Sequence, residues 1–517
     1  MPNNGWYQLE QSKLKKPSPF AAERQRGMMA RTPYVPAQPP APAPPELAPA
    51  AEPAPLPEPV AETAPKPEPE LKPEPEFTPV QPPLPSGPHS QTVGPNGPVL
   101  LQDNVLHETL DEFVTDTVPE RAVHGKGWGA FGRFICEHPM GEYTMLPFLQ
   151  REGQSVDTVS RFSLAVSNRG TPDTARNVRG FSTKFYTSDG VFDLLCNHLP
   201  VFAVRDAIRF PEVIRALSPS PVSGLIEQGR FWDFVAQAPE SLHFVTWLYS
   251  DVGTLKSLRH LRAYGVNTYV WKNAAGERRY VKYHWVPAAG TEFITAQAAE
   301  RLAGEDPDIA GRDLWEAVAR GAGPEYELRV QLMDPADARD LPFDPLDCTK
   351  VWDETRYPLL PVGRLKLLRN PENYREQVEK LAFSPANLLP GAELSDDKML
   401  QGRANVYWSA QRHRLGHGFR AIPVNRQADW RPDRLVTSGL GVEVSGAQTR
   451  SGLQKQDDFT QAGERFRAFS AEEQDHLAAN LAQGLRAAPE SVRGAVLSGL
   501  FQADEAYGSA VAQKLAD

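Results

Sequence analysis

The sequence predicts an α+β protein built on an antiparallel β-sheet that is closed or nearly so. Short runs such as G-A-F-G-R-F-I-C (129–136), V-S-R-F-S-L-A-V (159–166) and G-F-S-T-K-F-Y-T (180–187) alternate large apolar residues with small or polar ones. This alternation is typical of strands with two different faces. Turn sequences join several of these runs, and helical patterns lie between and after them.

The chain begins with a proline-rich tail. Residues 33–98 hold about half of the 50 prolines, in runs of Pro, Ala and Glu that cannot bury enough apolar surface to offset chain entropy. We therefore expect residues 1–98 to be disordered and partly polyproline II. A solvating spacer is the simpler interpretation, and an unidentified partner with a proline-binding groove is the alternative.

Two β-hairpins are expected in the strand region. T-S-D-G joins F-Y-T to V-F-D-L-L, with Asp189-Gly190 supplying a positive-φ turn, and N-A-A-G-E joins N-T-Y-V-W-K to R-R-Y-V-K-Y-H-W. Y-E-L-R-V-Q-L-M predicts a further strand, and helices are expected near 231–248 and 291–320.

The last part of the chain predicts a small helical bundle. Residues 345–425 contain few strand patterns, and from about residue 457 the apolar period becomes helical. Ser470 with Glu473 is expected to form a capping box, followed by an apolar repeat of Leu477, Leu481 and Leu485. Two later helices are expected to start at Pro489 and at Asp504.

Composition excludes several classes of protein. A net charge of −10 and a pI near 5.7 argue against a nucleic-acid partner, and no run of apolar residues is long enough to span a membrane. The N-terminus lacks the layout of a secretory signal. Cys136, Cys196 and Cys348 fit no disulfide framework or metal knuckle, so we expect buried thiols and a cytoplasmic location.

The segment R-A-N-V-Y-W-S-A-Q-R-H-R-L-G (403–416) carries the most chemical information. Arg403 and Tyr407 are at i and i+4, so on a helix they share a face. A permanently charged guanidinium beside a phenol favours the phenolate, which suits ferric iron. Alone, such a pair is more often an ordinary surface contact.

Four upstream motifs give this segment its weight. They are R-A-V-H-G-K-G-W-G-A-F-G (121–132), R-F-S (161–163), N-V-R-G-F-S-T-K-F-Y-T (177–187) and D-L-L-C-N-H-L-P-V-F (193–202). Together with residues 403–416 they resemble the haem catalases, in the same order, and the likeness runs from about residue 102 to the C-terminus.

The resemblance implies the catalase fold, an eight-stranded antiparallel β-barrel whose wall holds the haem. We expect the barrel in residues 99–345, a wrapping segment with the proximal haem ligand in 346–430, and a C-terminal helical domain in 431–517. The chain ends before the flavodoxin-like domain of the large-subunit catalases, which predicts the small-subunit type. A homotetramer that disproportionates hydrogen peroxide to water and dioxygen is expected.

Three residues match the distal, peroxide-binding side of the family. His124 matches the catalytic histidine, and a histidine can take and return a proton near neutral pH. Asn197 matches the amide that holds a peroxide oxygen without titrating, and Ser163 matches the residue that bonds the second ring nitrogen of His124. Without the resemblance, His124 would be a core histidine and Asn197 a turn residue.

The remaining matches concern the haem, expected to be haem b. Tyr407 matches the iron ligand, kept anionic by Arg403. The residues that match partners of the two propionates are Arg121, Arg161 and Arg414. The residues that match pocket residues packed on the porphyrin are Val123 and Phe210.

Departures from the family concern mainly NADPH. Members that bind NADPH commonly have S-D-R-G and V-W-P-H where this chain has Val252 and Glu354, although His243 is retained. Val252 removes a cation, and Glu354 adds a negative charge near the position of a phosphate group of NADPH. NADPH is therefore a doubtful cofactor, and we expect it not to bind. Asn267 and Gln411 replace histidines near the proximal face, which should tune the activity without abolishing it.

Two alternatives stay open from the sequence. The first is a haem peroxidase or hydroperoxide isomerase on the same fold; isomerising relatives tend to place Thr before the distal histidine, so Val123 favours a catalase. The second is a scaffold with a vestigial enzyme core, which the intact catalytic positions disfavour.

Overall fold

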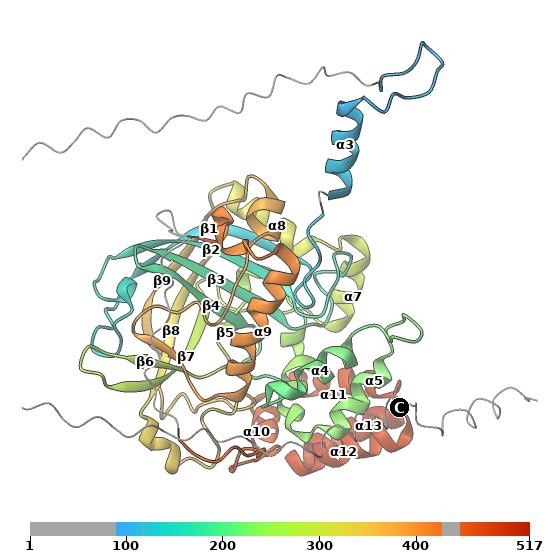
Figure 1. Ribbon diagram of the computed structural model, residues 1–517. Helices are drawn as coiled ribbons and strands as arrows, with labels where there is room; N and C mark the ends of the chain where they lie inside the picture. The colour runs from blue at the N-terminus through green and yellow to red at the C-terminus, as the bar shows by residue number, and fades with distance from the viewer. Residues whose placement is uncertain (1–88, 116, 427–444) are drawn as a thin grey trace, which may run out of the picture. The chain divides into compact units, whose positions relative to one another are not determined.

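The computed structural model describes residues 89–115, 117–426 and 445–517 (Figure 1). The proline-rich tail predicted over residues 1–98 therefore lies mostly outside the described residues. Among those described, no helix is long and apolar enough to cross a bilayer.

The centre of the fold is a closed antiparallel β-barrel. Eight strands follow one another around the ring, and β7 closes it by pairing with β8. In ring order these strands are β1 (Gly127–Cys136), β2 (Ser155–Leu164), β3 (Arg179–Thr187), β4 (Gly190–Asn197), β5 (Ala263–Tyr264), β7 (Arg278–Pro287), β8 (Glu325–Met333) and β9 (Leu360–Arg369). Outside the ring, β6 (Tyr269–Lys272) pairs with β7, and β10 (Ala392–Leu394) pairs with β6.

Alternation along the strands fills the barrel with aromatic rings. On β3, Phe181 and Phe185 point inward and are fully buried. Phe185 packs at 5.5 Å from Phe134 of β1, and Phe181 stacks at 5.6 Å from Trp285 of β7. Such ring pairs stabilise the core beyond the area they bury. The intervening residues of β2, β3 and β4 therefore face outward, where the candidate site lies.

Both predicted hairpins are confirmed, with one correction. β3 and β4 meet at the pair Thr187–Gly190, so the two loop residues are Ser188 and Asp189 rather than Asp189-Gly190. Gly190 has φ of 145° and Asp189 is not in a left-handed conformation. β6 and β7 are joined by residues 273–277, as expected.

Strand β9 was not expected, because it lies in the range 345–425 that contains few strand patterns. It pairs with β1 and β8 and so completes the ring from within the predicted wrapping segment. Pro361 and Gly363 disguise the strand, since both residues are depleted in sheets. The alternation of buried Leu365 and Leu367 with exposed neighbours was the available indication.

Helices cover the barrel and form a separate bundle. Each predicted helical stretch contains two helices, because Pro239 and Pro307 interrupt them. Within the described residues, the α-helices apart from α9 are α3 (Asn104–Thr115), α4 (Phe210–Leu217), α5 (Gln228–Gln237), α6 (Leu242–Tyr249), α7 (Ala296–Glu305), α8 (Ile309–Ala319), α10 (Thr460–Ala468), α11 (Ala471–Leu485), α12 (Glu490–Ala503) and α13 (Glu505–Ala516).

The C-terminal bundle follows the prediction closely. Ser470 and Glu473 form the capping box of α11, and the leucine repeat of that helix is fully buried. Pro489 precedes α12, and Asp504 caps α13 by accepting hydrogen bonds from two backbone amides. These helices share a second hydrophobic cluster with α5 and α6, beside which they lie in Figure 1.

Candidate functional site

A cross-strand row on the outer face of β2, β3 and β4 brings the three predicted distal residues together. Ser163 is the pairing partner of Gly180, and Gly180 is the partner of Asn197. The ring of His124 lies over the middle of this row: a Cβ atom added to Gly180 would be 2.9 Å from its Cε1 and Nδ1 atoms. Gly180, which the sequence reasoning missed, therefore makes room for the imidazole.

His124 is held in an unusual conformation. Its φ of 63° is one of two positive values among the described residues other than glycine. Its backbone N–H donates to Ala165 O at 2.7 Å, and its Nδ1 lies 2.9 Å from Ser163 Oγ. Because Nδ1 is occupied, Nε2 is the ring nitrogen available to a substrate.

The surroundings keep His124 uncharged. Burial, together with the nearby guanidinium groups of Arg161, Arg403 and Arg121, lowers the pKa of His124 from 6.5 to about 3. A neutral imidazole at pH 7 can accept a proton from a bound acid.

Three of the predicted arginines meet around one carboxylate. Arg121 Nη1 lies 3.5 Å from Glu379 Oε2, and Arg161 Nη2 lies 4.0 Å from Glu379 Oε1. Arg121 and Arg414 donate to the same two backbone carbonyls, those of Glu379 and Leu381. Burial lowers the pKa of all three guanidiniums, that of Arg414 to about 10.

This arginine cluster (Arg121, Arg161 and Arg414) has unused binding capacity. The carboxylate of Glu379 also lies 3.7 Å from Arg169 Nη2, whereas Arg414 donates to the backbone carbonyl of Glu379. This single carboxylate therefore balances only part of the positive charge gathered around it. Arg121 Nη1 and Arg161 Nε are buried and have no hydrogen-bond acceptor. Buried guanidinium groups of this kind are costly unless an anion pairs with them. The cluster therefore fits a ligand that carries carboxylates.

Glu379 was not found from the sequence. It ends a short π-helix, Arg375–Glu379, that buries Val378 and Glu379 although its residues are mostly polar. Such π-turns are frequent at functional sites. Its carboxylate also accepts a hydrogen bond from Tyr374 Oη at 3.0 Å.

On helix α9 (Lys398–Leu415), Arg403 and Tyr407 form the predicted pair. Arg403 Nη2 donates to Tyr407 Oη at 3.2 Å, and Arg403 Nη1 donates to Asn267 Oδ1 at 2.5 Å. Asn267 Nδ2 in turn donates to Asp397 Oδ2 at 2.7 Å. Although burial opposes the charge, interactions with Tyr407 and Tyr269 raise the pKa of Arg403 above its ordinary value.

Both ends of this chain of contacts are anchored. Asp397 caps α9 by accepting from Met399 N and Leu400 N, and burial raises its pKa to about 6. Asn267 follows Val266, which has φ of 62°, and its N–H donates to Gly265 O at 2.7 Å. This strained turn fixes where Asn267 meets Arg403.

A buried ion pair connects α9 to the barrel wall. Lys184 and Asp193 are cross-strand partners on β3 and β4, 2.6 Å apart, with no side-chain exposure. Asp193 accepts from Ser384 N at 2.9 Å, and Ser384 Oγ accepts from Trp408 Nε1. Trp408 follows Tyr407, so the tie fixes the part of α9 that carries the tyrosine.

The histidine side and the tyrosine side of the site lie on one face of the wall. Tyr407 packs on a cluster that includes Val159 and Leu195. These two residues are on the same outward faces of β2 and β4 as Ser163 and Asn197.

The remaining predicted residues are less closely joined. Val123 is partly buried immediately before His124. Phe210 stacks on Phe202 at 5.8 Å and belongs to the hydrophobic cluster of the helical bundle rather than to the wall. Gln411 donates to Phe383 O and accepts from Arg414.

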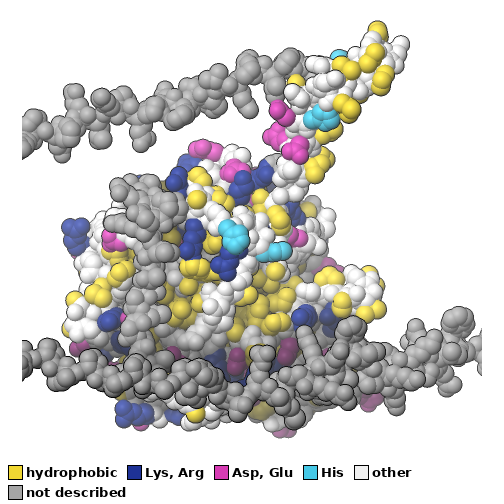
Figure 2. Space-filling view, viewed as in Figure 1, with side chains coloured by type: hydrophobic (Ala, Val, Ile, Leu, Met, Phe, Trp, Pro, Cys, Tyr) yellow, Lys and Arg dark blue, Asp and Glu magenta, His cyan; other side chains and the backbone are white. Residues whose placement is uncertain are grey.

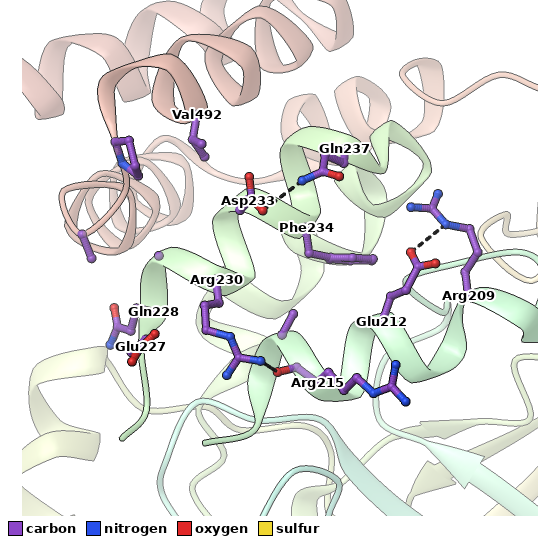
Figure 3. Close-up of a pocket in the computed structure, with 14 residues that line it drawn as sticks. Arg209, Glu212, Arg215, Glu227, Gln228, Arg230, Asp233, Phe234, Gln237 and Val492 are labelled. Carbon is purple, nitrogen blue, oxygen red and sulfur yellow. Dashed lines mark hydrogen bonds and ion pairs between the residues drawn. The ribbon is translucent and has the colours of Figure 1, made fainter. Parts of the chain in front are cut away.

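The surface carries a separate pocket of about 790 Å³ between α4, α5 and the start of α12 (Figure 3). Its lining mixes basic and acidic side chains, such as Arg215, Arg230 and Asp233, and includes none of the predicted site residues. This pocket is therefore separate from the site predicted from the sequence.

Over the barrel, hydrophobic side chains gather in the middle of the face shown in Figure 2, below a group of Lys, Arg and His side chains.

Family models match almost the whole described chain. The model described as Catalase matches residues 80–455, and the model described as Catalase-related immune-responsive matches residues 453–515.

Individual proteins match over similar lengths. The chain is 38% identical over 463 residues to "Catalase" of Capsicum annuum, covering 84% of this chain and 94% of that protein. It is 39% identical over 456 residues to "Catalase isozyme 3" of Zea mays, covering 82% and 92%. Among solved structures, a bacterial catalase aligns with a TM-score of 0.78 at 33% identity, covering 83% of this chain and 93% of that one. Catalase A of Saccharomyces cerevisiae aligns with a TM-score of 0.77 at 31% identity, covering 84% and 97%.

Proposed function

The chain belongs to the catalase family, enzymes that decompose hydrogen peroxide, and on that premise we propose how its own residues perform the reaction. His124 and Asn197 act on the peroxide, Ser163 orients His124, and Tyr407 ligates a haem iron. The observation that carries the proposal is the His124 ring above the row Ser163–Gly180–Asn197.

The residues present fit haem. The arginine cluster carries more positive charge than the carboxylate of Glu379 balances, and it has buried N–H groups without hydrogen-bond acceptors, which suits the propionates of haem. Tyrosine is the known axial ligand of catalase haem, and the hydrogen bond from Arg403 to Tyr407 supports Tyr407 as the proposed ligand. When bound, haem supplies the iron redox chemistry that peroxide decomposition needs.

The distal residues move one proton. Neutral His124 would accept it at Nε2 from one oxygen of the bound peroxide and return it to the other oxygen, while the haem would supply the electrons for the O–O bond. Ser163 holds the ring through Nδ1 at 2.9 Å. The amide of Asn197 donates a hydrogen bond to the peroxide at any pH.

The proximal residues hold charge without moving protons. The Arg403 guanidinium stabilises the Tyr407 oxygen at 3.2 Å, and the neutral amide of Asn267 links Arg403 to Asp397. Because an amide does not titrate, Asn267 cannot share a proton along this chain of contacts as a histidine could. We expect this to tune the iron rather than to abolish activity.

NADPH is not part of this proposal. Glu354 pairs with Arg262 at 3.3 Å, and Val252 packs in a hydrophobic cluster and offers no cation. Both ring nitrogens of His243 have partners, Thr349 O at 3.0 Å and Trp247 Nε1 at 3.0 Å. A phosphate group would meet a carboxylate there instead of a free donor. When the protein is titrated into a fixed concentration of NADPH, the fluorescence of the dinucleotide should stay unchanged.

Haem b, a homotetramer of the small-subunit type and a cytoplasmic location remain predictions from the resemblance, and so does the absence of a nucleic-acid or membrane partner. The pyridine spectrum of the extracted haem tests for haem b, and sedimentation tests for the homotetramer.

Oxygen evolution tests the proposed reaction. Purified holoprotein should release dioxygen from hydrogen peroxide and should give little turnover of cumene hydroperoxide, which a haem peroxidase or isomerase would consume. Consumption of cumene hydroperoxide without oxygen release from hydrogen peroxide would favour that alternative.

A further inference from the structure

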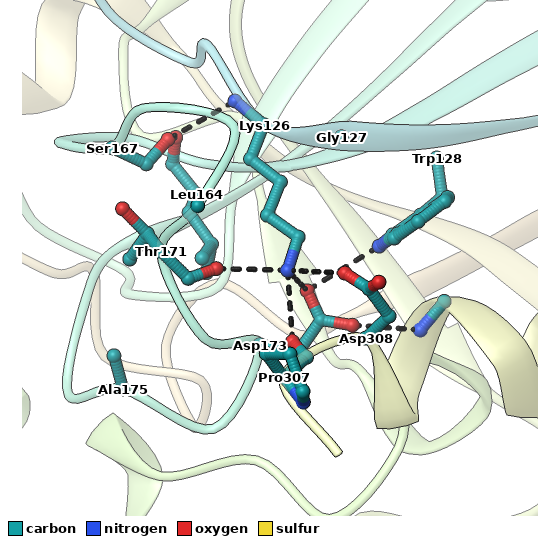
Figure 4. A network of polar contacts seen from close by, with 12 residues as sticks. Lys126, Gly127, Trp128, Leu164, Ser167, Thr171, Asp173, Ala175, Pro307 and Asp308 are labelled. Carbon is teal, nitrogen blue, oxygen red and sulfur yellow. Dashed lines mark hydrogen bonds and ion pairs between the residues drawn. The ribbon is translucent and has the colours of Figure 1, made fainter. Parts of the chain in front are cut away.

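The ammonium group of Lys126 is buried two residues after His124 and surrounded by oxygen atoms (Figure 4). Its Nζ lies 2.8 Å from Thr171 O, 2.8 Å from Pro307 O, 2.8 Å from Asp308 Oδ1 and 3.1 Å from Asp173 Oδ1. An ammonium has three protons, so four acceptors satisfy it completely.

This cluster joins three segments that are distant in the sequence. Asp173 also accepts from Trp128 Nε1 of β1 at 3.3 Å and from Gly311 N of α8 at 2.9 Å. Lys126 thus holds the start of β1, the loop after β2 and the connection between α7 and α8 together. A buried charge that bridges segments is costly to lose, because its partners are left unpaired.

The backbone beside this cluster is strained at His124. The left-handed φ of 63° persists only where neighbouring contacts enforce it. Those contacts come from the end of β2 and the loop that Lys126 holds. His124 N donates to Ala165 O, Lys126 N donates to Ser167 Oγ at 3.2 Å, and Leu164 N donates to Lys126 O at 3.1 Å. If the loop shifts, the contacts that keep His124 over Gly180 shift with it.

We propose that Lys126 is a positioning residue that keeps His124 in its left-handed conformation and thereby sets the geometry of proton transfer. The proposal rests on the function assigned above to His124. Lys126 acts only through His124 in this proposal, since its Nζ is directed into the cluster of oxygens of Thr171, Pro307 and the two aspartates (Figure 4).

The test compares wild-type holoenzyme with Lys126→Met, which keeps the length of the side chain and removes the charge. Lys366→Met is the matched control, because Lys366 of β9 is likewise a lysine of the barrel that pairs with a carboxylate, that of Glu325, but it is half exposed. Asp308→Asn is a milder variant at an exposed position, for use if Lys126→Met fails to fold. The measurements are crystal structures, haem per chain, the ferric absorption spectrum and the Kd of cyanide.

Cyanide reports on His124 because it binds iron as the anion and must give up a proton on the distal side. We expect Lys126→Met to keep its haem and its ferric spectrum while His124 leaves the left-handed region and the Kd of cyanide rises about tenfold to a hundredfold, the effect of misplacing a reacting group by about 1 Å. Asp308→Asn should change the Kd in the same direction by less, and Lys366→Met should not change it.

An unchanged His124 loop with a wild-type cyanide Kd per haem would overturn the proposal, whatever happens to the thermal stability. Loss of haem in Lys126→Met with unchanged cyanide affinity of the remaining holoenzyme would also overturn it, because the role would then be in folding. A wild-type protein that binds cyanide but evolves no oxygen would refute the proposed function, and the cyanide and structural comparison would still decide the role of Lys126.

Discussion

The rate of peroxide decomposition should stay level as the pH falls from 7 to 5. Burial, together with Arg161, Arg403 and Arg121, lowers the pKa of His124 from 6.5 to about 3. At pH 5 only about 1% of such a histidine is protonated, whereas a histidine of pKa 6.5 would be about 97% protonated and its rate as a base about 30-fold lower. The acid limb should therefore begin only below about pH 4.

Initial oxygen evolution, measured from about pH 4.5 to about pH 9 at constant ionic strength, checks this prediction. The haem absorbance at each pH is the control, because loss of haem in acid would lower the rate for another reason. A fall in rate with a midpoint near pH 6.5, at unchanged haem content, would refute the assignment of His124 as a base kept neutral by burial and nearby arginines.

Four further changes test other parts of the account. Tyr407→Phe should lose stable haem or change the ferric spectrum, since phenylalanine offers no oxygen ligand; normal haem with an unchanged spectrum would contradict the assignment. Asn197→Ala should keep its haem and lose less turnover than removal of the distal histidine, because the amide orients the peroxide without transferring a proton; an equal or larger loss in the oxygen assay would require a new role for it. Asp193→Asn should lower the free energy of unfolding by about 3–5 kcal/mol in urea titrations, because it leaves the fully buried ammonium of Lys184 without its carboxylate; a loss below about 1 kcal/mol, the size of an exposed pair, would mean the tie to α9 is not structural. Deletion of residues 1–79, which lie outside the family match, should leave haem content and turnover unchanged in the purified protein, and a haem-free truncation would show that the tail is structural.

Local periodicity was enough to predict most of the barrel. The alternation around Phe181 and Phe185 and the turn at residues 273–277 depend on neighbouring residues, so the sequence displays them directly. Strand β9 was missed because Pro361 and Gly363 hide its alternation, and its pairing with β1 depends on residues more than two hundred positions away.

The candidate site was predicted only where motifs exist. His124 and Tyr407 lie in recognisable segments, whereas Glu379 lies in a charged stretch that predicts an exposed turn. Its burial comes from the π-helix and from arginines of distant segments. Asp193 and Lys126 were missed for the same reason, since their partners are brought to them by the closed barrel and the connection between α7 and α8.

The central claim is that His124, held over the row Ser163–Gly180–Asn197, transfers the proton in peroxide decomposition. The initial rate of oxygen release and the oxygen released per peroxide consumed, both measured side by side for the wild type and His124→Ala at equal haem content, test it most directly. The account predicts one dioxygen for every two peroxides in the wild type and a rate lower by about 10²–10⁴-fold in the haem-replete variant. A haem-replete His124→Ala that evolves oxygen at the wild-type rate would contradict it.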